Sequence, residues 1–263
     1  MGDETQGRLD LTTGTPGRGG TAVLAERAEP PVLPAIGRLD WDALAAALDA
    51  DGFALTPPLL TPAQCAEVAD LYDRDDVFRS TVVMARHAFG EGSYRYFRRP
   101  LVPVVESLRR QLYPPLARIA NRWARILGER TWPEDFDELI AMCAAAGQHR
   151  PTPLLLHYQP GGYNCLHQDV YGDVTFPLQV AIMLSVPDVD FTGGESVFVE
   201  QRPRAQSRPA VARPAQGQGL IFPVRHRPVP AAKGYKRVIM RHGVSAVHAG
   251  ERYVLGVIFH DAR

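Results

Sequence analysis

The sequence predicts an α+β protein with a mainly β core, in which helices of the N-terminal half pack on an antiparallel barrel or sandwich. Helical periodicity and capping signals are confined to the chain before residue 150. From Pro153 onward, short runs rich in Val, Ile, Leu and aromatic residues are separated by Gly, Pro and Asp, with no helical pattern between them. Strands that follow one another in this way form antiparallel sandwiches or barrels.

Length and composition favour one globular domain. The chain has 263 residues, of which 45% are apolar and 22% charged. Residues 1–35 are rich in Gly, Thr, Pro and Glu, and we expect them to form a disordered tail. Residues 36–263 are then expected to form a single domain, with a helical part at about 40–150 and the β core at about 151–263.

Two helices of the N-terminal half have clear end signals. Asp40 is a candidate N-cap of an Ala- and Leu-rich helix that ends at Gly52. Thr61 is the candidate N-cap of the next helix, and Pro62 occupies its first position, where a missing N–H costs nothing.

The rest of the N-terminal half is less regular. A third helical region covers roughly 101–127, and its Pro-Pro pair predicts a break inside it. A fourth, short helix is expected at about 134–146. Between the second and third helices, residues 89–100 mix glycines, aromatic residues and arginines, which favours a loop or the edge of a sheet.

The C-terminal half contains the strand candidates. We further expect 237–244 and 252–259 to form an antiparallel hairpin around the turn at 249–251, which would bring His242 and Arg252 to one mouth of the barrel. The strand candidates are LLLHY (154–158), FPLQVAIMLSV (176–186), ESVFVE (195–200), GLIF (219–222), RVIMRHGV (237–244) and RYVLGVIFHDA (252–262).

The spacing of His167 and Asp169 indicates a metal site. Residues two apart on a strand point the same way, about 6.6–7 Å apart along the backbone, so an imidazole and a carboxylate converge on one ion. Two such ligands and one distant histidine make the 2-His-1-carboxylate triad of non-haem iron enzymes. His242 and His248 are the candidates for the distant histidine. Cys165 shares the strand face of His167 and is either a thiolate ligand or, as we prefer, a small core residue.

Net charge and cysteine usage limit the function classes. The formal net charge is zero, so the molecule as a whole is not attracted to nucleic acid or membrane. Its three cysteines, Cys65, Cys143 and Cys165, are widely spaced and odd in number, which indicates a reducing compartment without a disulfide framework. No run is typical of a secretory signal or a membrane span, so we expect a cytoplasmic protein.

Residues 80–263 together resemble the 2-oxoglutarate/Fe(II)-dependent oxygenases, specifically their prolyl-4-hydroxylase-like branch. The runs HQDVYGDVTFPLQ, EQRPRAQSR and RHGVSAVHAGERYVLGVIFHDA are further similar to a bacterial subgroup of that superfamily. The family motifs in chain order are Tyr158, Gly161–Gly162, His167 and Asp169, Gly193–Gly194–Glu195, His242 and Arg252.

The resemblance implies a double-stranded β-helix, or jelly roll, and an assignment of roles. Fe(II) would be held by His167, Asp169 and His242, and 2-oxoglutarate by Arg252, with Tyr158 hydrogen-bonding the cosubstrate carboxylate. Dioxygen would then hydroxylate a second substrate while 2-oxoglutarate is decarboxylated to succinate. An aspartate in the triad favours hydroxylation or desaturation, because related halogenases carry a small residue in its place.

Several neighbouring residues have alternative interpretations. His248 is expected at the surface or behind the ligands, and His260 with Asp261 is interpreted as structural. A buried Arg252 needs an anion, which is either the cosubstrate or an acid such as Glu251. Asn164 and Gln179 are weaker candidates for polar groups inside the barrel, and Tyr158 is equally well explained as a core aromatic residue.

Charge is segregated along the C-terminal half. Residues 161–200 contain six acidic and no basic residues, whereas 201–241 contain ten basic and no acidic ones. Neighbouring strands that neutralise each other are the simpler explanation. Alternatively, arginines at 202–208 and 225–227, with Arg95, Arg98 and Arg99, ring the mouth and attract an anionic substrate.

The sequence therefore predicts an oxygenase that hydroxylates a small molecule or an amino-acid side chain, and we rank a polynucleotide below these. A nucleobase-modifying oxygenase is the alternative within the superfamily, with Tyr94, Tyr96 and Phe97 as candidates to hold a flipped base. A jelly-roll module that binds metal without turnover is the alternative from another class.

Overall fold

The computed structural model describes residues 30–202 and 204–263. The predicted disordered tail lies largely in residues 1–29, outside the described residues. The helices are α1 (Pro34–Gly37), α2 (Trp41–Asp51), α3 (Pro62–Asp70), α4 (Pro103–Leu127) and α5 (Phe136–Ala145), with 3-10 turns η1 (Leu71–Asp73), η2 (Asp75–Val77) and η3 (Met84–His87). The strands are β1 (Ala54–Pro58), β2 (Phe78–Val83), β3 (Gly90–Glu91), β4 (Ser93–Phe97), β5 (Leu154–Tyr158), β6 (Tyr163–His167), β7 (Leu178–Met183), β8 (Phe191–Gly193), β9 (Ser196–Gln201), β10 (Arg208–Ala212), β11 (Gln218–Pro223), β12 (His226–Pro230), β13 (Tyr235–Val244), β14 (Val247–Gly250) and β15 (Arg252–Val257).

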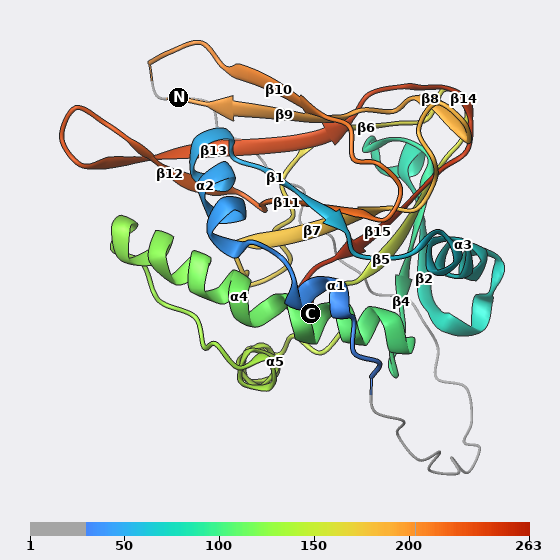
Figure 1. The fold of residues 1–263 in the computed structure, drawn as a ribbon, viewed down its shortest axis with the longest axis horizontal. Coiled ribbons are helices and arrows are strands. Elements are labelled where there is room, and N and C mark those ends of the chain that lie inside the picture. The colour runs from blue at the N-terminus through green and yellow to red at the C-terminus, as the bar shows by residue number, and fades with distance from the viewer. Residues whose placement is uncertain (1–29, 203) are drawn as a thin grey trace.

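The strands form two larger sheets in which every strand pairing is antiparallel (Figure 1). One sheet has the order β1-β11-β7-β15-β5-β4-β2. The other has the order β10-β9-β13-β6-β3, with β12 also paired to β13. Aromatic side chains join the two sheets, because Phe198 of β9 contacts Phe222 of β11 with ring centroids 5.3 Å apart. The arrangement is the predicted jelly roll with helices contributed by the N-terminal half.

The helix ends follow the sequence signals. Asp40 accepts a hydrogen bond from the Ala43 backbone N–H, and α2 ends at Gly52, whose φ of 82° is in the left-handed region. Thr61 and Gln64 form a reciprocal capping box at the start of α3. Both predicted helices are confirmed at their N-terminal boundaries.

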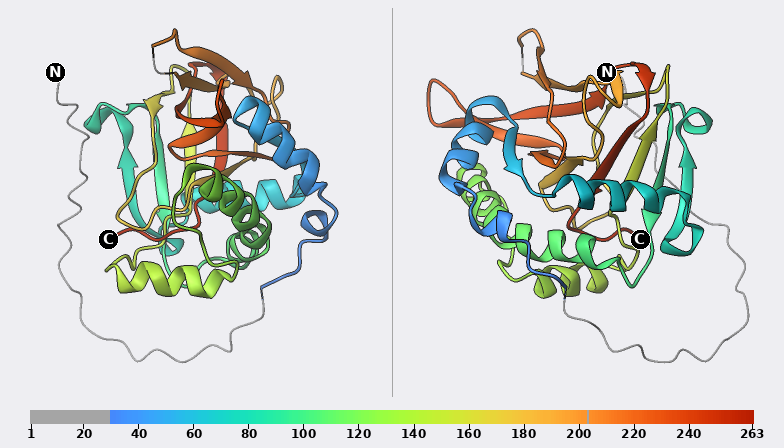
Figure 2. Two further views of the ribbon diagram at one scale, coloured as in Figure 1. Left: turned by 90° about the vertical axis from the view of Figure 1, so that its left-hand side faces the viewer. Right: turned by 45° about the vertical axis from the view of Figure 1, so that its right-hand side comes forward.

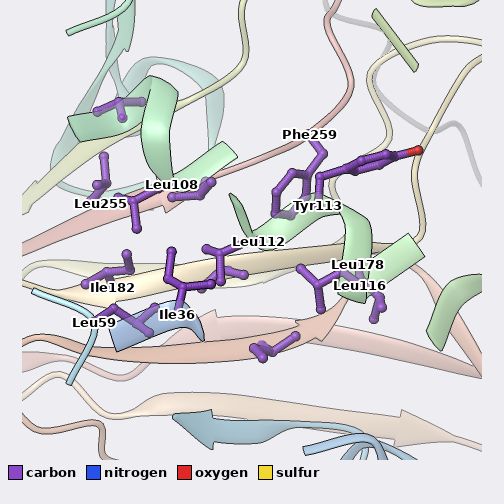
Figure 3. Packing of buried hydrophobic residues seen from close by; sticks show 14 of the residues in the cluster. Ile36, Leu59, Leu108, Leu112, Tyr113, Leu116, Leu178, Ile182, Leu255 and Phe259 are labelled. Carbon is purple, nitrogen blue, oxygen red and sulfur yellow. The ribbon is translucent and has the colours of Figure 1, made fainter. Parts of the chain in front are cut away.

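The predicted break in the third helical region is wrong, because helix α4 runs through it. It is continuous over 25 residues, with Pro114 and Pro115 inside it. Each proline removes one intrahelical hydrogen bond, but this helix is buried along most of its length. Its side chains pack on the seven-stranded sheet, as Leu112 and Leu116 do beside Leu178 in Figure 3, and this tertiary burial outweighs the local loss. Both α4 and α5 lie on the same side of the sheets (Figure 2).

Two strand predictions also change. Residues 93–97 form β4, an interior strand between β5 and β2, rather than a loop or an edge. The predicted hairpin of 237–244 with 252–259 is wrong: β13 pairs with β6, β9 and β12, whereas β15 pairs with β5 and β7 in the facing sheet. The chain crosses between the sheets at β14, which pairs with β8. Among the described residues, no helix is long and apolar enough to span a bilayer.

Candidate metal centre

Two paired strands of the six-stranded sheet, β6 and β13, bring His167, Asp169 and His242 together. His167 is the last residue of β6 and lies directly opposite His242 of β13, with ring centroids 4.2 Å apart. Asp169 follows β6 in a loop, so it is not on the strand as predicted. Its Oδ1 lies 3.4 Å from His167 Nε2, and its Oδ2 lies 3.0 Å from His242 Nε2. One ligand atom from each residue lies within 4.8 Å of the others, which is the arrangement that could hold one metal ion.

A bulge in β6 sets the orientation of these side chains. The pairing shifts between His242↔His167 and Val244↔Asn164, so two residues of β6, Cys165 and Leu166, oppose the single Gly243 of β13. As a result Asn164 reaches the interior hydroxyl of Tyr158 and His167 still faces the triad. Cys165 is exposed and is not part of the cluster, which corrects both its predicted face and its interpretation as a core residue.

Hydrogen bonds hold the metal-facing atoms in place. His167 donates its Nδ1–H to the Cys165 carbonyl at 2.8 Å, which leaves Nε2 with a free lone pair for a cation. Both oxygens of Asp169 are held, Oδ1 by the Tyr171 hydroxyl and Oδ2 by the Gln179 side-chain amide, each at 2.7 Å. Such contacts orient metal ligands in known sites.

The electrostatics of the cluster suit a cation. Burial raises the pKa of Asp169, but His167 and His242 outweigh it and hold that pKa well below its usual value. Burial lowers the pKa of His167, yet the neighbouring carboxylate raises it overall. Burial and the nearby His167 lower the pKa of His242. A positive charge stabilises the buried carboxylate between the two imidazoles, and a divalent metal ion would supply one.

A buried arginine lies deeper in the same barrel. Arg252, 3% exposed, opens β15 and pairs with Tyr158 of β5, and its guanidinium lies 5.4 Å from the Tyr158 ring centroid. Burial lowers the pKa of Arg252 to about 10. Its Nη2 lies 3.5 Å from the Ser196 hydroxyl, and its Nε has no hydrogen-bond partner among the described residues.

Arg252 has no ion pair with an acid of the described chain. Glu251, the alternative partner, instead accepts a hydrogen bond from the Tyr253 hydroxyl at 3.0 Å and lies 3.1 Å from His157 Nε2. Burial raises the pKa of Tyr158 to about 12, so its hydroxyl stays protonated and available as a donor beside the guanidinium. Arg252 and Tyr158 together offer a positive charge and hydrogen-bond donors, which are the groups that bind a carboxylate ligand.

Other predicted residues lie elsewhere. His248 is exposed on β14 and does not join the triad. His260 and Asp261 are buried, and Asp261 pairs with Arg109 of α4 at 2.9 Å, which agrees with a structural role. Tyr171, by contrast, was not singled out from the sequence. Its position two residues after Asp169 was the available signal, because that spacing lets a side chain fold back onto the carboxylate.

Most arginines of the predicted ring at the mouth form ion pairs with acidic side chains of the protein. Arg227 is 1% exposed and binds Glu200 and the C-terminal carbonyls of α2, so it does not reach the mouth. Other arginines of the ring, and two near it in the chain, also pair with acids: Arg202–Glu200, Arg208–Asp51, Arg95–Asp75, Arg99–Asp261, Arg213–Asp188 and Arg237–Glu129. Local neutralisation is thus the main explanation for the charge segregation.

The aromatic residues proposed to hold a flipped base are buried. Tyr94 and Tyr96 point into the barrel, where their rings meet edge to face with centroids 5.4 Å apart. Phe97 packs on Phe78 in the core. None of the three lies at the surface, which corrects the prediction that they line the mouth.

A protein family described as "Oxygenase, catalysing oxidative methylation of damaged DNA" matches residues 92–262. Two uncharacterised proteins of Mycobacterium tuberculosis, from strains CDC 1551 and H37Rv, are each 51% identical over 164 residues, which cover 62% of this chain and 70% of theirs.

Solved structures share the fold. A prolyl hydroxylase from Trichoplax adhaerens, in complex with a fragment of hypoxia inducible factor, has a TM-score of 0.55 at 15% identity and covers 84% of this chain and 89% of its own. The non-haem α-ketoglutarate-dependent epimerase SnoN from nogalamycin biosynthesis has a TM-score of 0.53 at 16% identity and covers 84% of this chain and 82% of its own. At these identities the likeness establishes the jelly-roll fold alone.

Proposed function

This chain belongs to the oxygenase family that matches residues 92–262, among the 2-oxoglutarate- and Fe(II)-dependent oxygenases, and from that membership we propose how its site works. His167, Asp169 and His242 would hold Fe(II). The observation that carries this role is the convergence of their ligand atoms within 4.8 Å, with His167 Nε2 left free by the bond from Nδ1. Two imidazoles and a carboxylate are the ligand set of non-haem Fe(II) oxygenases.

Arg252 would bind the far carboxylate of 2-oxoglutarate, and Tyr158 would donate a hydrogen bond to it. Support comes from the unsatisfied Nε of a guanidinium that is almost fully buried. An unpaired buried charge is costly, so a ligand carboxylate at this position stabilises the loaded protein. When bound, iron and 2-oxoglutarate supply the oxidising chemistry, in which dioxygen oxidises 2-oxoglutarate to succinate and carbon dioxide and a C–H bond of a second substrate to C–OH.

The second substrate would approach from the side of His167. Its side chain is 35% exposed, whereas those of Asp169 and His242 are 11% and 13% exposed. Leu166 and Val170, which flank the two ligands of the His-x-Asp motif in the chain, are large exposed hydrophobic residues. They would bind an apolar part of the substrate and exclude water from the reacting C–H bond.

A base of damaged DNA is the substrate class that we propose first, because the family description names damaged DNA. The target C–H bond would belong to the base, and a base extruded from its stack would have to reach His167 from outside.

A small molecule or an amino-acid side chain is the second candidate. The barrel interior beside the triad favours it: Phe222 lies 4.6 Å from the His242 ring, and Tyr94 and Tyr96 add buried hydroxyls. Enclosed apolar surfaces with a few polar groups are typical of small-ligand sites.

A cytoplasmic location and a domain boundary near residue 36 remain predictions.

An anaerobic titration tests the site. Fe(II) and then 2-oxoglutarate are added to the apoprotein, and the weak visible band of iron chelated by a 2-oxo acid is followed. We expect a band that is lost in His242→Ala, kept in His248→Ala, and obtained in Arg252→Ala only at much higher 2-oxoglutarate. No band in the wild-type protein would contradict the oxygenase role and favour a metal-binding module without turnover.

Succinate release tests the substrate. We expect stimulation by oligonucleotides that carry methylated bases, with loss of the modification detected by mass spectrometry and no activity in Asp169→Ala. Stimulation by free amino acids or peptides, but by none of the oligonucleotides, would instead support the second candidate.

A further inference from the structure

Strands β12 and β13 form a hairpin that extends beyond the body of the protein. Its turn closes with the Ala231 N–H donating to the Gly234 carbonyl at 3.0 Å, and Gly234 has a φ of 66°. The tip projects past α2 and the end of α4, at the left of Figure 1. We call residues 225–237 the basic hairpin.

The tip of the basic hairpin is exposed and positively charged. All residues from 230 to 237 are exposed, and they include Lys233, Lys236 and Arg237 but no acid. Tyr235, 54% exposed, lies among them with its ring accessible. Arg237 pairs with Glu129, whereas Lys233 and Lys236 have no ion pair within the described part of the chain.

The basic hairpin leads directly to the candidate metal centre. Along strand β13, the seven residue steps from Tyr235 to His242 cover about 23 Å at ~3.3 Å per residue. At its base, the carbonyl of the exposed Arg225 accepts hydrogen bonds from Gln168 Nε2 at 3.0 Å and from the Met240 N–H at 2.7 Å. Gln168 lies between His167 and Asp169 in the chain, so Arg225 stands beside the approach to the triad.

We propose that the basic hairpin binds the phosphate backbone of the DNA strand whose base is presented to His167, an inference that rests on the proposed action on DNA. Arg225, Lys233 and Lys236 would contact phosphates, and Tyr235 would stack on a base. The 23 Å span corresponds to about seven steps of duplex DNA at ~3.4 Å each, enough to anchor the strand beside an extruded base.

The positive charge at the tip of the basic hairpin is a local feature and does not reflect the net charge of the chain. The net charge of the chain is zero, and most arginines of residues 201–241 are neutralised by acids. Screening limits exposed charges to about 10 Å at 0.1 M salt, so distant acids have little influence on a phosphate at the tip. The basic hairpin joins a tip that carries unpaired positive charge and an exposed aromatic ring to a base that contacts Gln168, between two of the candidate metal ligands.

Fluorescence anisotropy of the full chain with labelled single-stranded and duplex oligonucleotides tests the proposal across a salt series. We expect Lys233→Glu/Lys236→Glu to weaken binding at least tenfold near 0.1 M salt and to lower the salt slope by about 2. Tyr235→Ala should weaken the single strand most. The matched control Arg74→Glu/Arg118→Glu makes the same change in net charge on exposed residues near η1 and on α4, and it should bind nearly as the wild type does.

The outcomes separate the two proposals. If the wild-type protein binds neither oligonucleotide, the proposed DNA substrate is wrong and this inference falls with it. If the wild type binds DNA but the hairpin variant binds as tightly, or loses no more than the control, the basic hairpin is not the contact, while action on DNA still stands. The metal and 2-oxoglutarate titration of each variant, which we expect to match the wild type, verifies that the fold is intact.

Discussion

The side-chain amide of Gln179 donates a hydrogen bond of 2.7 Å to Oδ2 of Asp169. Gln179 is buried in β7 of the seven-stranded sheet, whereas Asp169 follows β6 of the facing sheet. The bond therefore spans the barrel and fixes the carboxylate relative to His242, whose Nε2 is 3.0 Å from the same oxygen.

Removing that bond should weaken metal binding. We expect Gln179→Leu to lower the affinity of the apoprotein for Co(II) or Mn(II) by about 10- to 100-fold, the usual effect of losing a partner of a metal ligand. The exposed Gln159→Leu is the control and should leave the affinity unchanged. A metal titration followed by absorbance or electron paramagnetic resonance measures both, and equal affinities would contradict the role of Gln179.

Gly194 should be needed for the shape of the Arg252 pocket. A Cβ at Gly194 would lie 2.9 Å from both Arg252 Cδ and Val247 Cγ2. We expect Gly194→Ala to displace the guanidinium and to weaken 2-oxoglutarate binding by about tenfold, an effect of order 1.4 kcal/mol, without changing metal affinity.

Gly161→Ala is the control for Gly194→Ala. Gly161 also has a positive φ, 85°, but a Cβ there meets no atom within 4 Å. Both variants share the backbone strain of a left-handed residue, and only Gly194→Ala adds the clash. Equal 2-oxoglutarate affinities by calorimetry in the two variants would show that contact with Arg252 is irrelevant.

His260 should make the fold sensitive to acid. Burial, and secondarily Arg109, lower the pKa of His260 to about 4 from its usual value of 6.5. Between these values the unfolded chain binds a proton that the folded chain does not, so the free energy of unfolding falls as pH decreases from 6.5 to 4 and is unaffected above 6.5. The loss amounts to at most about 3 kcal/mol.

The His260→Asn variant tests this dependence by urea unfolding at pH 7 and pH 4.5. An asparagine oxygen can still accept the Phe176 N–H that His260 Nδ1 accepts at 3.2 Å, but it does not titrate. We expect the variant to lose less stability than the wild type between the two pH values, and the exposed His248→Asn to lose as much as the wild type. Parallel losses in all three proteins would refute the prediction.

Arg109 should be far more important for stability than its neighbour Arg110. Arg109 is fully buried, pairs with Asp261 at 2.9 Å and donates to the carbonyls of Ile258 and Phe259. Arg109→Met leaves Asp261 with only the partly exposed Arg99, so we expect a loss of about 3–5 kcal/mol. Arg110→Met removes half-exposed pairs and should cost less than about 1 kcal/mol, both by urea denaturation.

Local signals in the sequence were sufficient for several features. The helix starts at Asp40 and Thr61 and the stop at Gly52 were predicted correctly, because each depends on hydrogen bonds within four residues. The juxtaposition of His167, Asp169 and His242 was likewise predicted, from a short motif and a family resemblance.

Other features depended on residues far apart in the chain. The crossing of β13 and β15 into opposite sheets, the continuity of α4 through Pro114–Pro115 and the burial of Arg227 were each missed. In each case the deciding interaction joins segments many residues apart, such as Arg227 with Glu200 and the end of α2.

The sequence by itself thus determined the helix ends, the strand-rich half and the identity of the candidate ligands. Only the tertiary structure decided which strands face one another, that a bulge turns Cys165 outward, and that Tyr171 and Gln179 hold Asp169. The physical reason is range: caps and periodicity act over one or two turns, whereas strand partners and buried charges are chosen by the burial of the whole chain.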